Sequence, residues 1–245
     1  MLARWLQGQW FEQRRLSPAL WFLAPLAGLY SAVAARRRRR SRSERLAVPV
    51  IVVGNITVGG AGKTPLTLWI AAQLLAHGWR PGIVSRGYGG RSTVPSPVGA
   101  DAAAVDVGDE PVLLARRSGL PVWVGRDRVA AGRALLATHP EVDVILCDDG
   151  LQHYRLARDV ELAVFDGRGI GNGWRLPAGP LREPLERLAG VDAVICNGSP
   201  DERLPTVLPR FAMRLRASDF YRLGDPQQRC AAADFAGRTL YALAG

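Results

Sequence analysis

One short segment constrains the fold of this chain more than any other, the glycine-rich run VGNITVGGAGKTP at residues 53–65. The β-branched run VPVIVV (48–53) precedes it and predicts a buried strand. The run TPLTLWIAAQLLAH (64–77) follows it and predicts a helix. A glycine-rich turn between a strand and a helix is the context that a phosphate-binding loop requires. The segment therefore predicts a P-loop in an α/β fold.

The residue types in this loop each suit one part of phosphate binding. Glycines let backbone N–H groups turn inward around phosphate oxygens. Lys63 would neutralise the β- and γ-phosphates, and the Thr64 hydroxyl would bind Mg²⁺. The general pattern G-x-x-x-x-G-K-[ST] is not fully met, because Thr57 replaces its first glycine. The predicted nucleotide-binding residues are Thr57, Val58, Gly59, Gly60, Ala61, Gly62, Lys63 and Thr64. The alternative is a tight strand–helix turn with incidental glycines.

Lysine usage supports the phosphate-loop interpretation. The chain has 32 Lys and Arg residues, and Lys63 is the single lysine among them. A general preference for arginine would explain the other 31, but not one exception inside a glycine-rich loop. Lysine is a compact point charge on a thin stem, whereas arginine is a broad planar fork. A narrow phosphate cradle therefore has room for lysine alone.

Short apolar runs alternate with helical patterns over most of the chain. We expect strands at 48–53, 81–86, 121–125, 142–150, 160–167 and 191–198, and helices at 64–77, 108–119 and 126–138. This alternation predicts a mainly parallel, doubly wound sheet flanked by helices, as in P-loop NTPases. Ligands bind beyond the carboxyl ends of the strands in such sheets. Residues 168–190 and 199–230 are rich in Pro, Gly and Arg, and we expect them to be mostly loop.

Carboxylates occur at two places where such a fold would use them. Asp148 and Asp149 end the strand VILCDD, where P-loop enzymes hold their second Mg²⁺ ligand. Adjacent strand residues point to opposite faces, so one can face Mg²⁺ while the other caps a loop or meets a substrate. Asp109 and Glu110 begin a helix, which is consistent either with capping or with a base that accepts a hydroxyl proton. A pair of ordinary turn residues is the alternative for Asp148 and Asp149.

Other polar residues are less specific. Arg86 and Tyr88 occur among the glycines of SRGYGG (85–90), which suits an exposed loop that contacts an anion or a base, or an ordinary turn. We expect His77 and His139 to be structural, and His153, close to the aspartate pair, has no assigned role.

The N-terminal region differs from the rest. Residues 18–35 (PALWFLAPLAGLYSAVAA) carry no charge, and residues 36–45 contain seven Arg and one Glu. A basic cluster beside an apolar helix is attracted to an anionic cytoplasmic leaflet. Pro25 and Gly28 interrupt the run, so we favour a helix lying in the membrane surface. A spanning anchor and a plain core or partner helix remain alternatives, whereas the arginines directly after the run argue against a cleaved signal peptide.

Charge and cysteine content exclude several classes. The formal net charge is +10, and residues 36–45 supply +6 of it, so we expect no nucleic-acid-binding face. The three cysteines have no C-x-x-C spacing, which argues against a disulfide framework and a zinc site.

Five ordered motifs resemble one known family. VGNITVGGAGKTP, SRGYGG, GDEPVLLARR, DDGLQHYRLARDVE and GNGWRLPAGPLREP are similar to the tetraacyldisaccharide 4′-kinases of lipid A biosynthesis. The resemblance covers roughly the whole chain. It implies phosphorylation, with ATP and Mg²⁺, of the 4′-hydroxyl of a tetraacylated glucosamine disaccharide 1-phosphate at the cytoplasmic face of the inner membrane.

The resemblance also implies roles for particular residues. Asp109 takes part in activating the hydroxyl, with Lys63 and Asp149 as further catalytic residues, and Asp148 joins Thr64 at the metal. The residues implied to line the site are Arg86, Tyr88, Glu110, Gln152 and Arg182. The family partners Asp109 with a histidine in a C-terminal segment that nothing here resembles, so none of the three histidines is assigned to that role.

Two other classes fit less well. A P-loop GTPase switch carries a base-reading N-K-x-D motif, which a chain with one lysine in its phosphate loop cannot contain. A membrane-tethered binding module would not need Lys63 and the aspartate pair. We divide the chain into a membrane-associated segment at 1–45 and a kinase domain at 46–245. GRTLYALAG (237–245) resembles a strand entering a turn, and we expect the domain to be truncated there.

Overall fold

The computed structural model describes residues 2–205, 207–216, 220–222 and 225–241. The chain divides into two compact units, Met1–Met213 and Arg214–Gly245. The first unit holds the sheet and the predicted phosphate loop, and the second holds a short hairpin.

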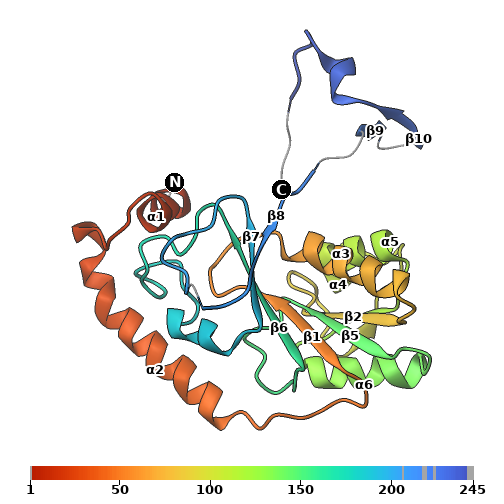
Figure 1. Ribbon diagram of the computed structural model, residues 1–245, viewed down its shortest axis with the longest axis horizontal. Helices are drawn as coiled ribbons and strands as arrows, with labels where there is room; N and C mark the ends of the chain where they lie inside the picture. Colours follow the sequence, from red (N-terminus) through yellow and green to blue (C-terminus); the bar gives the residue numbers. More distant parts are fainter. Residues whose placement is uncertain (1, 206, 217–219, 223–224, 242–245) are drawn as a thin grey trace. The chain divides into compact units, whose positions relative to one another are not determined.

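The first unit is built on one eight-stranded sheet with the order β3-β4-β2-β5-β1-β6-β7-β8 (Figure 1). Every neighbouring pair is parallel except β3 with β4. The predicted mainly parallel sheet is therefore confirmed. Its strands are β1 (Val50–Gly54), β2 (Pro81–Ser85), β3 (Ser96–Pro97), β4 (Val122–Val124), β5 (Val144–Asp148), β6 (Val160–Asp166), β7 (Ala193–Asn197) and β8 (Arg210–Met213).

Helices cover both faces of this sheet. Successive side chains of a strand point to opposite faces, so strands that are apolar throughout need a covering layer on each face. On β5, Ile145 packs with helix α6, whereas Leu146 packs with helices α3 and α5 on the other face. The helices are α1 (Leu2–Phe11), α2 (Ala24–Arg40), α3 (Lys63–Ala76), α4 (Ala104–Val107), α5 (Asp109–Ser118) and α6 (Arg128–Thr138), with 3-10 helices η1 (Pro18–Leu23), η2 (Leu185–Gly190) and η3 (Ala232–Phe235). The sheet is thus doubly wound.

The expected apolar N-terminal helix is present. Helices η1 and α2 form one continuous segment, Pro18–Arg40, which by length and composition alone could cross a membrane. Only 11% of the most apolar 18-residue stretch of this segment is buried. Helix α2 continues through the arginine run, which the sequence interpretation had separated from the helix.

The local structure differs from the sequence-based expectation in three places. Residues 199–230, expected to be mostly loop, contain β8 and the antiparallel pair β9 (Phe220–Arg222) and β10 (Asp225–Cys230). Strand β3 and helix α4 were not expected, because both are too short to show periodicity. The strand expected at 237–245 is absent from residues 237–241, and residues 242–245 lie outside the described residues.

Candidate active site

The glycine-rich loop lies at the carboxyl end of β1, in the middle of the sheet. Strand β1 lies between β5 and β6, so residues that follow these three strands meet at one edge. The approach is close: a Cβ added at Gly54 would lie 2.7 Å from Cγ of Leu151, in the loop after β5. Helix α3 begins directly after the loop, with Gly62 as its N-cap. The predicted strand–loop–helix context is therefore present.

The backbone of the loop suits a phosphate cradle. Gly59 and Gly62 adopt φ values of 97° and 94°, which favour glycine. A Cβ on Gly62 would also lie 2.9 Å from Met213 Cε and 3.0 Å from Asn197 Nδ2, whereas one on Gly60 would meet nothing within 4 Å. The loop is therefore shaped by its glycines and open at Gly60, as phosphate binding requires.

Lys63 and Thr64 lie beside the two aspartates at the end of β5. Lys63 Nζ is 3.6 Å from Asp149 Oδ1, and the Lys63 side chain is only 10% exposed. The Thr64 hydroxyl donates to Asp148 Oδ2 at 3.3 Å, and the Thr67 hydroxyl donates to Asp148 Oδ1 at 3.0 Å. A threonine hydroxyl beside a carboxylate is a donor set that fits Mg²⁺. The residues present therefore fit a nucleotide with its metal ion.

The two aspartates have opposite electrostatic environments. Burial raises the pKa of Asp148 to about 6, although Thr67 donates to it, and the charge of Glu110 adds to the rise. Burial also acts on Asp149, but the nearby Lys63 and Arg182 outweigh it and lower its pKa. Asp149 itself has φ 49°, a left-handed conformation that turns it out of the strand. One carboxylate thus faces the threonines and the other faces cations.

The remaining predicted residues lie around this centre at different distances. Arg182 is 3.4 Å from Asp149 Oδ2. Tyr88 is 75% exposed, and its loop packs on the start of α5, since a Cβ on Gly108 would lie 2.6 Å from the Tyr88 carbonyl. Asp109 accepts the Glu110 N–H at 3.0 Å. Among the described residues, no hydrogen bond joins Asp109 to the loop or to the aspartates.

Gln152 belongs to a partly buried polar network that also contains residues not singled out from the sequence. Its amide donates to the Asn55 carbonyl at 2.9 Å and to Glu183 Oε1 at 2.8 Å. Tyr154 donates to the other oxygen of Glu183. Asn55 is fully buried at the loop entrance, and its Nδ2 donates to Thr57 Oγ1. The spacing N-x-T at 55–57 was the available signal for Asn55. Glu183 lies in the motif GNGWRLPAGPLREP, but no spacing distinguished it from its neighbours.

Arg168, also missed, contacts the phosphate loop from the end of β6. Its guanidinium donates to the Gly60 carbonyl at 3.1 Å and pairs with Asp166 at 2.6 Å. The same group lies over the Phe11 ring of α1, 4.6 Å from the ring centre. Arg168 therefore links α1 to the loop.

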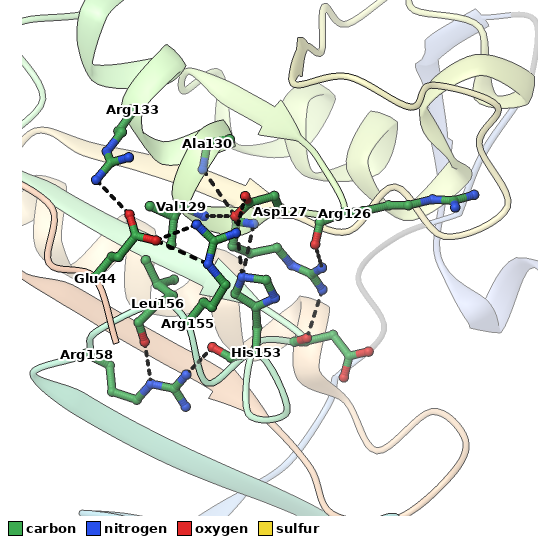
Figure 2. A network of polar contacts seen from close by, with 12 residues as sticks. Glu44, Arg126, Asp127, Val129, Ala130, Arg133, His153, Arg155, Leu156 and Arg158 are labelled. Carbon is green, nitrogen blue, oxygen red and sulfur yellow. Dashed lines mark hydrogen bonds and ion pairs between the residues drawn. The ribbon is translucent and has the colours of Figure 1, made fainter. Parts of the chain in front are cut away.

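A second polar network holds the loop after β5 to α6 and to residue 44 (Figure 2). Arg155 pairs with Glu44 and, at 2.6 Å, with Asp127, the N-cap of α6. The His153 ring nitrogen Nε2 accepts the Arg128 N–H at 3.3 Å. Burial and the charge of Arg128 lower the pKa of His153 to about 4. His153 is thus a neutral structural acceptor. His77 is exposed and its ring contacts the Gln73 carbonyl, while His139 is half-buried and its ring contacts Glu141.

A P-loop at the carboxyl edge of a parallel sheet, with a lysine, a threonine and two aspartates around it, defines the chain as a P-loop phosphotransferase. The model of the tetraacyldisaccharide-1-P 4′-kinase family matches residues 19–245. The chain belongs to this family, a family of kinases of lipid A biosynthesis. The resemblance found in the sequence motifs is confirmed.

Individual relatives agree with this assignment. The tetraacyldisaccharide 4′-kinase of Dechloromonas aromatica is 64% identical over 246 residues, covering 100% of this chain and 74% of the relative. That of Chromobacterium violaceum is 55% identical, covering 99% and 73%. A crystal structure of LpxK from Aquifex aeolicus in complex with ATP has a TM-score of 0.70 and 30% identity, covering 79% of this chain and 64% of that chain.

Proposed function

We propose that this chain transfers the γ-phosphate of ATP, with Mg²⁺, to the 4′-hydroxyl of a tetraacylated glucosamine disaccharide 1-phosphate. The observation that carries the proposal is Lys63, buried in a glycine-shaped loop 3.6 Å from Asp149 and adjacent to the Thr64–Asp148 contact. The identity of the acceptor is inferred from the family to which the chain belongs. We also propose that residues 1–45 form the membrane-associated part and residues 46–245 the kinase part.

Phosphoryl transfer requires little covalent chemistry from a protein. Catalysis therefore comes mainly from positioning of the reactants and from stabilisation of charge in the transition state. In this proposal the loop N–H groups and Lys63 hold the β- and γ-phosphates. Thr64 and Asp148 would hold Mg²⁺, which supplies charge neutralisation on the phosphates when bound. Asp149, fixed between Lys63 and Arg182, would orient groups at the transferred phosphate.

We assign the acceptor side to the start of α5 and the loop after β2. Asp109 would accept the proton of the sugar hydroxyl, with Glu110 beside it at the N-terminus of the helix. Arg86, Tyr88, Gln152 and Arg182 would line the acceptor. Arg86, Gln152 and Arg182 line one cavity with Asp149, and Tyr88 follows β2 at the carboxyl edge of the sheet. These positions support the assignment.

The proposed acceptor is a tetraacylated lipid that stays in a bilayer, so the enzyme must bind at the surface of that bilayer. We infer that helix α2 lies in the cytoplasmic face of the inner membrane. The exposed apolar side chains of η1 and α2, which include Trp21, Phe22 and Leu29, and the C-terminal arginines of α2 support this placement. The exposed residues would enter the acyl region and the arginines would meet anionic headgroups.

The direct test is transfer of radiolabel from γ-labelled ATP to the disaccharide lipid in mixed micelles, with the full chain. We expect label in the lipid fraction that depends on the enzyme, on Mg²⁺ and on the lipid. Removal of Mg²⁺ with a chelator should abolish transfer, and added Mg²⁺ should restore it. Absence of label in the lipid at saturating substrates would refute the proposal.

A further inference from the structure

Three side chains from outside the glycine-rich loop hold three of its consecutive carbonyl groups. The carbonyls belong to residues 59, 60 and 61, and their donors, in the same order, are Asn55 Nδ2 at 3.4 Å, Arg168 Nη2 at 3.1 Å and Asn197 Nδ2 at 3.5 Å. Asn55 follows β1, Arg168 follows β6 and Asn197 ends β7. These strands are neighbours in the sheet, so the fold itself brings the three carbonyl-holding residues to the loop.

Each of these contacts fixes the direction of the next backbone N–H group. A peptide unit is planar and trans, so its C=O and N–H bonds point in opposite directions. A donor that holds one carbonyl therefore turns the N–H of the following residue away from itself. The contacts at residues 59–61 act in this way on the N–H groups of Gly60, Ala61 and Gly62.

The three N–H groups are available to a ligand. No backbone carbonyl of the described residues accepts a hydrogen bond from the N–H of Gly60, Ala61 or Gly62. Successive backbone N–H groups that point into the same concavity form an anion site, and in phosphate loops they surround the α- and β-phosphates. The carbonyl contacts therefore hold the loop in the form that binds phosphate.

Arg168 makes the shortest of the three contacts and is itself held in place. Its Nε and Nη2 atoms donate to the two oxygens of Asp166 at 3.1 and 2.6 Å, and its guanidinium lies over the Phe11 ring. A two-point pairing of this kind fixes the plane of the guanidinium. The Nη2 atom that meets Asp166 also meets the Gly60 carbonyl, so Arg168 acts on the loop backbone and not on a phosphate.

We propose that Arg168, assisted by Asn197, is a positioning residue of the nucleotide site. By holding the Gly60 carbonyl outside the loop, Arg168 presents the Ala61 N–H to the β-phosphate of the nucleotide. Asn197 does the same for the Gly62 N–H through the Ala61 carbonyl. The inference rests on the proposed function, because it names residues that prepare the same site for its nucleotide.

The test measures nucleotide affinity in the full chain without turnover. Arg168→Met keeps the length of the side chain and its contact with Phe11 but removes every donor. Calorimetric titrations with ADP and with ATP compare this variant with the wild type. We expect both affinities to fall about tenfold, because a hydrogen bond from a charged donor to the loop is lost in each case. ADP and ATP should be affected equally, since both carry the β-phosphate.

Two further variants separate the contact from the charge. Arg203→Met is the matched control, because Arg203 pairs with Asp201 through the same two atoms but gives its remaining contact to the Gly171 carbonyl. We expect it to leave both affinities unchanged. Asn197→Leu removes a donor of similar size without any change of charge. It should lower both affinities about threefold, less than Arg168→Met because its contact is longer.

A measurement on the nucleotide-free chain distinguishes positioning from direct contact. Backbone order parameters from NMR relaxation report how rigidly the loop N–H groups are held. We expect values for Gly60 and Ala61 to fall from about 0.85 in the wild type toward about 0.6 in Arg168→Met, and to stay the same in Arg203→Met. An arginine that only touched a phosphate would leave these values unchanged before nucleotide binds.

Three results would overturn the inference. Wild-type affinity for ADP in Arg168→Met would show that the contact does not serve binding. A loss confined to ATP would place Arg168 on the γ-phosphate, and a loss of affinity with unchanged order parameters would mean direct contact. The proposed function fails by a different result. A wild-type chain that shows these binding effects but transfers no phosphate to lipid would refute the kinase proposal and leave the positioning role standing.

Discussion

At the scale of single residues, Lys63 is where composition, position and geometry coincide. It is the only lysine in the sequence, it begins α3, and its ammonium group lies beside Asp149 in a nearly closed site. We predict that Lys63→Ala lowers kcat/KM for lipid phosphorylation by about 10³-fold or more, because charge stabilisation of the transferred phosphate is lost. Steady-state kinetics measure this effect, and far-ultraviolet circular dichroism should show an unchanged fold.

Lys63→Arg is the matched control, because it keeps the charge and changes the shape of its carrier. We expect it to be impaired as well, since a guanidinium does not fit the space that the lysine stem occupies. Full turnover in Lys63→Ala would remove the basis of the phosphate-loop assignment.

Gly62 is the loop residue whose replacement should cost the most stability. Its φ of 94° is strained for any residue with a Cβ, and that Cβ would also displace the ends of the Asn197 and Met213 side chains, whereas the space beside Gly60 is open. We predict that Gly62→Ala lowers the free energy of unfolding by about 1–3 kcal/mol. Gly60→Ala should change it by less than about 1 kcal/mol. Urea unfolding without nucleotide measures both, and equal losses would contradict the argument.

At the scale of elements, the loop after β5 is held to the first turn of α6 through His153 (Figure 2). The folded-state pKa of about 4 lies below the ordinary value of 6.5, so the folded chain binds fewer protons between these values. The stabilisation is complete above about pH 6.5 and is lost as the pH falls toward 4. We predict that His153→Gln, which keeps an acceptor, flattens the fall in unfolding free energy between pH 7 and 5.

The surface histidine His77 supplies the control for that measurement. His77→Gln should leave the pH dependence of the wild-type chain unchanged, because its ring is exposed. Parallel curves for His153→Gln and the wild type would show that His153 is not the group responsible.

The elements that could be predicted from the sequence are those with a long apolar pattern or with a motif of particular residue types. Strands such as β1 and β5 are continuous apolar runs, and the glycine-rich loop carries its own signature. The sequence could not predict β3, which has two residues, or β8, which directly follows Pro209 in a proline-interrupted stretch and is defined by its pairing with β7. For the same reason Glu183 and Arg128 were missed from the site, since only the fold brings them to Gln152 and Asp149.

At the scale of the whole molecule, the proposed kinase chemistry and the proposed membrane contact belong to adjoining parts of the first unit. Helix α2 exposes Leu26, Leu29 and Val33 by 51%, 62% and 45%, while the same helix contributes Arg37 to the cavity beside Asp149. An apolar surface of this kind on a helix followed by arginines is typical of a segment that lies in a membrane interface. The acceptor could therefore pass from the bilayer to the site without leaving the protein surface.

This arrangement predicts that membrane binding and nucleotide binding can be separated. The triple change Leu26→Ser, Leu29→Ser and Val33→Ser should lower partition into vesicles with about one third anionic lipid at least tenfold, since each buried aliphatic side chain contributes about 1.5–3 kcal/mol. The affinity for ATP should stay the same, because the glycine-rich loop is untouched. Removal of residues 1–45 should have a larger effect in the same direction.

Leu75→Ser with Trp79→Ser, at and just beyond the end of α3, is the control for the loss of exposed apolar surface. Vesicle flotation and nucleotide titration measure the two affinities, and equal partition of the triple variant and the wild type would place the membrane contact elsewhere.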